Sequence, residues 1–303
     1  MHPVHKRIAI GFAATCLAVV LPSCGDTAQG RADETKRSAD TLAISTWKLP
    51  KELSFCGERV PLDIPEVRER AEREFYINLQ TPGQIILYIK RSGRYFPTYE
   101  KVLKEAGAPD DLKYLSVAES ALFMARSPKD AVGLWQFIPS TGRAYGLTIT
   151  DEIDERRNVI KSTKAAIAYL RAGREANGSW SNAAAGYNMG HENLSGNVKF
   201  QQKDDYYDLF LNEETSRYIL RIAMVKHLME HAHKYGIIVP ESERYTAPPT
   251  RTIRENGAVS NLAQWAMANG TTYKDVKLLN PWILGRGIPA PPNGRVWEVE
   301  IPR

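Results

Sequence analysis

The chain has 303 residues, of which 43% are hydrophobic and 25% are charged. This is the composition of an ordinary globular protein that is long enough for one substantial domain and a smaller appendage. The net charge of +5 suits an anionic partner such as nucleic acid, lipid headgroups or the acidic cell wall. Charge alone excludes none of these three partners, so the choice among them depends on the N-terminal segment and on the sequence motifs.

The N-terminus has the features of a bacterial export signal. Basic residues 5–7 precede the apolar run 8–20, which is too short for a comfortable membrane span. The run ends in the sequence LPSC, which resembles the lipobox, where the signal is cut before a cysteine that carries lipid. We therefore expect residues 1–23 to be a signal peptide and Cys24 to be lipidated. The alternative is an ordinary secretory signal followed by a chance cysteine.

The export signal also limits location and partners. A nucleic-acid binder has only the basic charge in its favour, and the signal argues against it. Gly25 follows the lipid cysteine in place of aspartate, which in many Gram-negative bacteria favours the outer membrane. We expect a cell-envelope protein anchored through Cys24 and facing the periplasm. Beyond Cys24 only Cys56 remains, so a disulfide framework is excluded, and we interpret Cys56 as an incidental apolar residue.

Residues 24–53 are predicted to form a flexible tether, because the stretch from 25 to about 43 is polar and almost free of large apolar side chains. An extended segment is expected at 54–64. Apolar residues then recur at helical spacing up to about residue 240, and strand signals are absent. The expected helices of this α-helical body, 54–240, are 67–76, 84–92, 95–105, 111–120, 139–145, 159–175, 180–187, 205–211 and 214–233.

A second, smaller module is predicted at 246–303. The end of the extended connection, with Pro248 and Pro249, lies at its start. Its expected elements are a strand at 251–254, helices at 261–268 and 273–279, and a closing strand at 296–301. The order strand, helix, helix, strand resembles the LysM wall-binding fold. We therefore expect a mainly α protein that ends in a small α+β module.

Glu119 is the strongest chemical signal, because it ends the otherwise apolar helical stretch 114–118. A carboxyl group in such a place is partly desolvated, and burial raises its pKa. A protonated carboxyl near neutral pH can serve as a general acid. A lone glutamate at a helix end is otherwise a solvated or capping side chain. The surrounding sequence must therefore decide between this interpretation and a catalytic role for Glu119.

The surrounding sequence resembles the lytic transglycosylase family. The pair Glu119-Ser120 is followed by Ser127 and by AVGLWQFIPST at 131–141. Three further blocks come in the family's order, DERRN from 154, AAGYNMG from 184 and ETSRY from 214. The arrangement looks closest to the membrane-bound D type, in which a lysozyme-like domain is followed by LysM modules. The resemblance implies a lysozyme-like body for this chain.

The resemblance implies that Glu119 cleaves the bond between N-acetylmuramic acid and N-acetylglucosamine without a metal or other cofactor. Glu119 protonates the leaving oxygen while the N-acetyl group stabilises the anomeric carbon. The carboxylate then deprotonates the 6-hydroxyl of the sugar, which closes a 1,6-anhydro ring. The substrate-binding candidates implied by the same blocks are Ser120, Ser127, Gln136, Tyr187, Asn188 and Glu214.

Roles within this set also follow from the resemblance. Ser127 and Tyr187 are expected near the carboxyl or the N-acetyl group, and Gln136 and Asn188 along the sugar subsites. Glu214 positions Tyr187 or the 6-hydroxyl, or else forms an ordinary ion pair with an arginine of its own helix, Arg217 or Arg221. For Trp135, also in this region, core packing is favoured over stacking on a sugar.

Two other functions stay open at this point. A water-using muramidase of the same fold needs a second carboxylate, for which Asp154 and Glu214 are the candidates. The other is a wall-binding lipoprotein without activity, which does not need a second carboxylate.

His227 and His231 are spaced four apart on a predicted helix, but a solvated helix face is favoured over a zinc site. Cleavage within strands or at their ends, glycan binding by the C-terminal module, and the oligomeric state are not determined.

Overall fold

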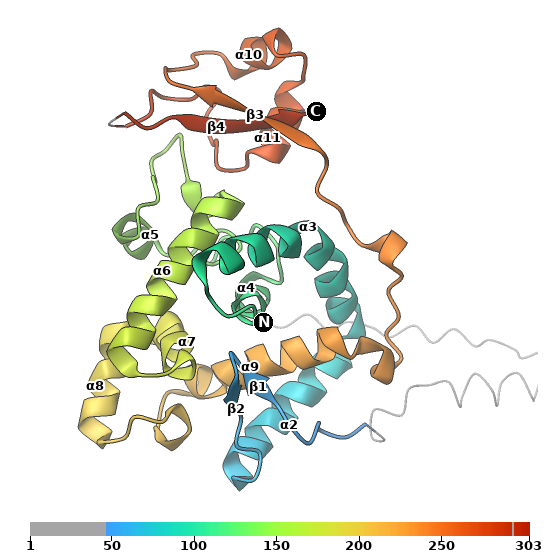
Figure 1. The fold of residues 1–303 in the computed structure, drawn as a ribbon, viewed down its shortest axis with the longest axis vertical. Helices are drawn as coiled ribbons and strands as arrows, with labels where there is room; N and C mark the ends of the chain where they lie inside the picture. The colour runs from blue at the N-terminus through green and yellow to red at the C-terminus, as the bar shows by residue number, and fades with distance from the viewer. Residues whose placement is uncertain (1–46, 293) are drawn as a thin grey trace, which may run out of the picture. The chain divides into compact units, whose positions relative to one another are not determined.

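The computed structural model describes residues 47–292 and 294–303, which contain a helical body and a small strand-containing module (Figure 1). The signal peptide and Cys24 lie outside the described residues. In the described part, no helix combines the length and apolar character needed to cross a membrane. Leu49 and Leu53, predicted to lie in the tether, are buried against the body. The prediction of a tether up to residue 53 is therefore wrong for this stretch, because its apolar side chains find a core to enter.

The body begins with a short antiparallel hairpin and continues as helices. The hairpin consists of β1 (Ser54–Phe55) and β2 (Glu58–Arg59). The α-helices are α2 (Pro65–Gln80), α3 (Pro82–Ala106), α4 (Leu112–Ser120), α5 (Pro139–Ala144), α6 (Val159–Asn177), α7 (Trp180–Met189), α8 (His191–Gln201) and α9 (Glu213–Glu230). Single 3-10 turns are η2 (Glu155–Arg157), η3 (Tyr206–Asp208), η4 (Ala232–Tyr235) and η5 (Glu241–Glu243).

Two predictions differ from the structure, and one helix was not predicted. The helices expected at 84–92 and 95–105 are one helix, α3, which continues through Pro97 and bends near its middle (Figure 1). The helix expected at 205–211 is only the 3-10 turn η3. Helix α8 was not predicted, because Leu194 is its only buried residue and its apolar periodicity is correspondingly weak.

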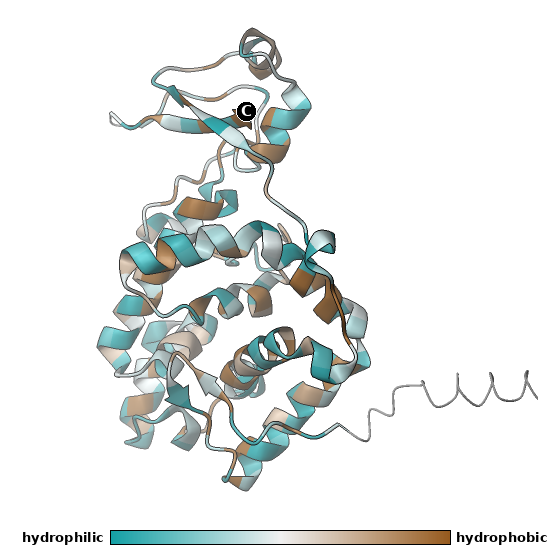
Figure 2. Cartoon of the chain, turned by 45° about the vertical axis from the view of Figure 1, so that its right-hand side comes forward, coloured by the Kyte–Doolittle hydropathy of each residue, from teal (hydrophilic) through white to brown (hydrophobic). Residues whose placement is uncertain are grey.

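Helix α4 lies in the centre of the body and positions the site. Seven of its nine residues are buried, and it packs against α3 and α9. Its apolar side chains join a core that includes Tyr99 and Trp135. Figure 2 shows hydrophilic and hydrophobic residues mixed along the helices, as expected for helices with one buried face. A polar side chain at the end of α4 is therefore held on an interior element that cannot shift freely.

The C-terminal module has the predicted order of elements. Its strands β3 (Thr250–Glu255) and β4 (Trp297–Pro302) pair antiparallel, and α10 (Leu262–Ala268) and α11 (Tyr273–Leu279) lie between them in the chain. Alternate residues of β4, namely Trp297, Val299 and Ile301, enter the module's core. The prediction of a βααβ module is confirmed.

Candidate active site

Glu119 lies at the last turn of α4, where the chain leaves the helix through two left-handed residues. Ala121 and Leu122 both have a φ of 54°, a conformation that is costly for residues other than glycine and is found preferentially at functional sites. The Glu119 side chain is half-buried. Burial raises the pKa of Glu119 to about 7, although a hydrogen bond from Tyr218 and the charge of Arg221 act in the opposite direction. The carboxyl can therefore hold a proton near neutral pH.

Tyr218 is the side chain that contacts this carboxyl. It is buried on α9, and its hydroxyl donates a hydrogen bond to Glu119 Oε1. Tyr218 is the last residue of the block ETSRY, and no contact between it and Glu119 was predicted. The available signal was its spacing from Glu214, because residues four apart lie on the same face of a helix. The carboxylate of Glu214 also raises the pKa of Glu119.

Ser120, predicted to bind substrate, uses its hydroxyl inside the protein. The side chain is only 8% exposed. Its Oγ lies 2.8 Å from the carbonyl oxygen of Leu134 and 3.0 Å from that of Ser116. The contact with Leu134 joins the end of α4 to the segment Gly133-Leu134-Trp135-Gln136. The Ser120 hydroxyl therefore fixes the loop beside Glu119.

The catalytic loop, residues 125–137, carries two more of the predicted residues. Ser127 Oγ accepts a hydrogen bond of 3.0 Å from the amide of Ala131 and so closes a turn. Gln136 has a φ of 51°, and its Nε2 donates to the Gly133 carbonyl at 2.7 Å. Both side chains stabilise the loop itself, and their contacts with a sugar stay predictions.

Tyr187 and Asn188 approach the site from α7. The Tyr187 hydroxyl donates to the carbonyl of Trp135 at 2.6 Å. Burial raises the pKa of Tyr187, and the charge of Glu119 adds to this effect. Asn188 donates to Glu214 Oε1 at 3.2 Å and accepts a 2.7 Å hydrogen bond from Thr215. The two residues therefore connect α7 to the catalytic loop and to α9.

Glu214 is not the ion-pair partner of the arginines on its own helix. Among the described residues, Arg217 and Arg221 both lie within 3.5 Å of the carboxylate of Glu74, which is buried on α2. The alternative interpretation of Glu214 is therefore wrong. The carboxylate contacts Asn188 instead, at the side of the site.

Trp135 is fully buried, and its indole donates to Thr163 Oγ1 at 2.9 Å. Its ring lies 5.2 Å from that of Tyr99, centroid to centroid. The prediction that Trp135 packs in the core is confirmed.

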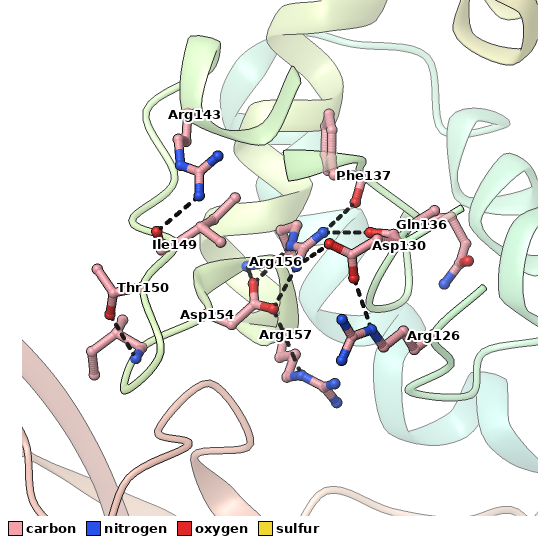
Figure 3. Close-up of polar contacts among 12 residues, drawn as sticks. Arg126, Asp130, Gln136, Phe137, Arg143, Ile149, Thr150, Asp154, Arg156 and Arg157 are labelled. Carbon is pink, nitrogen blue, oxygen red and sulfur yellow. Dashed lines mark hydrogen bonds and ion pairs between the residues drawn. The ribbon is translucent and has the colours of Figure 1, made fainter. Parts of the chain in front are cut away.

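Asp154 forms a two-point ion pair with Arg156, as Figure 3 shows. Its two carboxylate oxygens each accept a hydrogen bond of 2.9 Å from the guanidinium, and the side chains are 6% and 4% exposed. A carboxylate held in this way is not free to activate water. Of the two candidates for the second carboxylate of a muramidase, Glu214 is the one whose charge raises the pKa of Glu119.

No group of three or more potential metal ligands occurs within 47–292 and 294–303. The rings of His227 and His231 stack at 4.5 Å, and His227 Nε2 lies 2.7 Å from the hydroxyl of Tyr235. Cys56 is a half-buried free thiol, and burial raises its pKa well above the usual range. This disfavours the thiolate that nucleophilic chemistry needs.

A helical body that holds a protonatable glutamate at the end of a central buried helix has the architecture of a lysozyme-like transglycosylase domain. Residues 98–210 match the family described as transglycosylase SLT domain. Residues 251–303 match the soluble lytic transglycosylase C-terminal LysM-like domain. The chain therefore carries both domains, and the predicted family resemblance is confirmed.

The chain is similar to membrane-bound lytic murein transglycosylase D of Escherichia coli (strain K12), with 28% identity over 239 residues. The match covers 77% of this chain and 52% of the relative, and the same protein of E. coli O6:H1 matches equally. A putative tributyltin chloride resistance protein of Alteromonas sp. (strain M-1) is 31% identical over 90 residues, which cover 29% of this chain and 44% of that protein. The chain spans about half the length of the curated relatives it matches.

Proposed function

We propose that the protein is a peptidoglycan lytic transglycosylase with Glu119 as its single acid and base. The observation that carries the proposal is the state of this carboxyl. It is half-buried, it accepts a hydrogen bond from Tyr218, and burial raises its pKa to about 7. It also lies within the part of the chain that matches the transglycosylase SLT domain. A pKa near the working pH lets one group donate a proton and later accept one.

The reaction uses no water. Protonated Glu119 gives its proton to the glycosidic oxygen as the bond from the anomeric carbon of N-acetylmuramic acid breaks, and the N-acetyl oxygen stabilises the positive charge. The Glu119 carboxylate then takes the proton of the 6-hydroxyl, whose oxygen attacks the anomeric carbon and forms the 1,6-anhydro bond. Glu119 ends the cycle protonated. The Tyr218 hydroxyl stabilises the carboxylate between the two steps.

Five residues are proposed to contact the glycan. Tyr187 and Asn188 reach the site from α7, and Glu214 lies beside Asn188. Ser127 and Gln136 are on the catalytic loop. Ser120 is proposed to act through that loop, because its hydroxyl is bonded to the Leu134 carbonyl.

The test is mass spectrometry of the soluble products after purified peptidoglycan is incubated with the protein. Products that end in 1,6-anhydro-muramic acid, absent with Glu119→Gln, are the expected result. The matched control is Glu230→Gln, because Glu230 also accepts a hydrogen bond from a tyrosine, Tyr114, but at the other end of α4. Reducing ends in place of anhydro ends would indicate a muramidase, with Glu214 as its second carboxylate. No release by the unaltered protein would indicate a wall-binding role.

We also propose that residues 1–23 are a signal peptide and that lipid on Cys24 anchors the protein in the outer membrane, facing the periplasm. The sequence LPSC and Gly25 support this proposal. Cys24→Ser is expected to release the protein from the membrane fraction, whereas Cys16→Ser, inside the signal, is expected to leave it there. Retention of the Cys24→Ser protein in membranes would refute the lipid anchor.

A further inference from the structure

The C-terminal module is attached to the body by backbone pairing as well as by its connection. Ile153, in the segment between α5 and η2, forms an antiparallel bridge with Ile283 of the module. The Asp154 amide donates to the Trp282 carbonyl at 2.8 Å, and the Leu284 amide donates to the Glu152 carbonyl at 2.7 Å. The Ile153 side chain is 0% exposed and belongs to the module's own hydrophobic core. The body thus supplies part of the module's interior.

Charged contacts and the connecting segment add to this attachment. Arg295 of the module lies 3.5 Å from the fully buried carboxylate of Glu155. Lys161 on α6 lies over the ring of Trp297 at 5.4 Å. The connecting segment is also held on α3, where the Tyr245 amide donates to the Lys90 carbonyl at 2.8 Å. Both ends of the module are therefore fixed to the body.

The segment that receives the module also holds the catalytic loop, as Figure 3 shows. Arg156 is buried, and its Nη1 donates to the Asp130 carbonyl at 2.7 Å and to the Phe137 carbonyl at 3.0 Å. These two carbonyls lie within and at the end of the loop. Gly133 packs so closely on the Arg156 carbonyl that a Cβ at this position would overlap it. Asp154, whose amide bonds to the module, orients the guanidinium of Arg156.

The catalytic loop in turn contacts the residues around Glu119. Its Leu134 carbonyl accepts from Ser120, the neighbour of Glu119 on α4. Its Trp135 carbonyl accepts from Tyr187. A continuous series of short contacts therefore leads from Ile153 and Asp154 through Arg156 and the catalytic loop to Ser120, the neighbour of Glu119. Ile153, Arg156 and Ser120 are themselves buried, so they have few alternative partners.

We propose that the C-terminal module is a positioning element for the catalytic loop, and that Ile153 and Arg156 are the positioning residues through which it acts. The kinetic part of this proposal rests on the proposed transglycosylase function. In this series the segment 153–156 contacts the module on one side and the catalytic loop on the other. A module that served only to recruit the enzyme to the wall would require neither the buried Ile153 nor the pairing with Ile283.

The test compares Ile153→Ser with Ile160→Ser in the full chain. Ile160 is a matched control, because it is exposed on the first turn of α6. Hydrogen exchange is measured by mass spectrometry. In Ile153→Ser the backbone amides of residues 283–285 and 130–133 are expected to exchange at least about tenfold faster, because these amides are hydrogen-bonded when the module is docked. On a soluble tetrasaccharide of the glycan, kcat is expected to fall about tenfold while KM changes less than about twofold. Ile160→Ser is expected to change neither.

Recruitment to insoluble wall plays no part in cleavage of a short soluble glycan, so this substrate separates positioning from binding. Faster exchange at 283–285 with unchanged exchange at 130–133 and unchanged kcat would overturn the proposal. If Ile153→Ser does not fold, Arg295→Ala removes an exposed contact, and a two- to threefold change of the same kind is expected; no change at 130–133 would again overturn the proposal. If the unaltered protein cleaves no glycan, the proposed function fails and the exchange data alone decide on positioning.

Discussion

Replacing Tyr218 by phenylalanine tests the proposed role of Glu119 most directly. The change removes the hydroxyl that donates to Glu119 Oε1 and keeps the buried ring. This hydrogen bond stabilises the carboxylate and so lowers the pKa of Glu119, while burial raises it to about 7 overall. Without the hydroxyl, burial and the charge of Glu214 still raise the pKa of Glu119, and only the charge of Arg221 still lowers it. The pKa of Glu119 must therefore increase.

The size of the shift follows from the strength of the bond. A hydrogen bond to a charged group contributes about 1.5–3 kcal/mol, and one pKa unit corresponds to about 1.4 kcal/mol. We therefore expect the Glu119 pKa to rise by about 1–2 units in Tyr218→Phe. The carboxylate formed in the first step also loses a donor, so the maximal rate is expected to fall about tenfold.

The assay is the pH dependence of kcat/KM for release of anhydro products. Its alkaline limb reports deprotonation of the general acid in the free enzyme. This limb is expected to move to higher pH in Tyr218→Phe and to stay in place in Tyr114→Phe, whose lost hydroxyl donates to Glu230. A Tyr218→Phe limb at the same pH as the unaltered protein, or at lower pH, would refute the assignment of Glu119 as the general acid.

Three further predictions concern stability, each measured by urea unfolding. Because burial raises the pKa of Glu119 from 4.5 to about 7, the folded protein binds this proton more tightly than the unfolded chain, so the carboxyl destabilises the fold increasingly between these pH values. Glu119→Gln is expected to raise the free energy of unfolding by about 3 kcal/mol at about pH 8 and hardly at about pH 4; an equal change at both would contradict this. A Cβ at Gly186 would overlap the ring of His191, so Gly186→Ala is expected to cost about 1–3 kcal/mol, and His191→Ala in the same chain to restore most of it; simple additivity would contradict the clash. Glu74 is 3% exposed, with two arginines of α9 at 3.3 and 3.5 Å, so Glu74→Ala is expected to cost about 3–5 kcal/mol. The exposed Glu72→Ala should cost less than about 1 kcal/mol, and equal losses would argue against a buried network.

The sequence by itself determined the elements with strong periodicity and the presence of the site. Apolar spacing located α2, α6, α7 and the βααβ order of the module, because burial of one face leaves a repeat that can be read along the chain. Glu119 was identified because a carboxyl after an apolar helical stretch is unusual and the family blocks followed it. Helix α8 was not predicted, because it buries a single residue and its sequence therefore shows almost no apolar repeat.

Only the tertiary structure decided which side chains meet. Tyr218 lies 99 residues from Glu119 in the chain, and no local pattern predicts their hydrogen bond. The hydrogen-bond partner of Ser120, the backbone carbonyl of Leu134, was not predicted for the same reason. The entry of Ile153 into the module's core likewise became visible only once both parts were packed. Propensity and periodicity describe contacts within one element, whereas contacts between distant residues depend on how the elements pack.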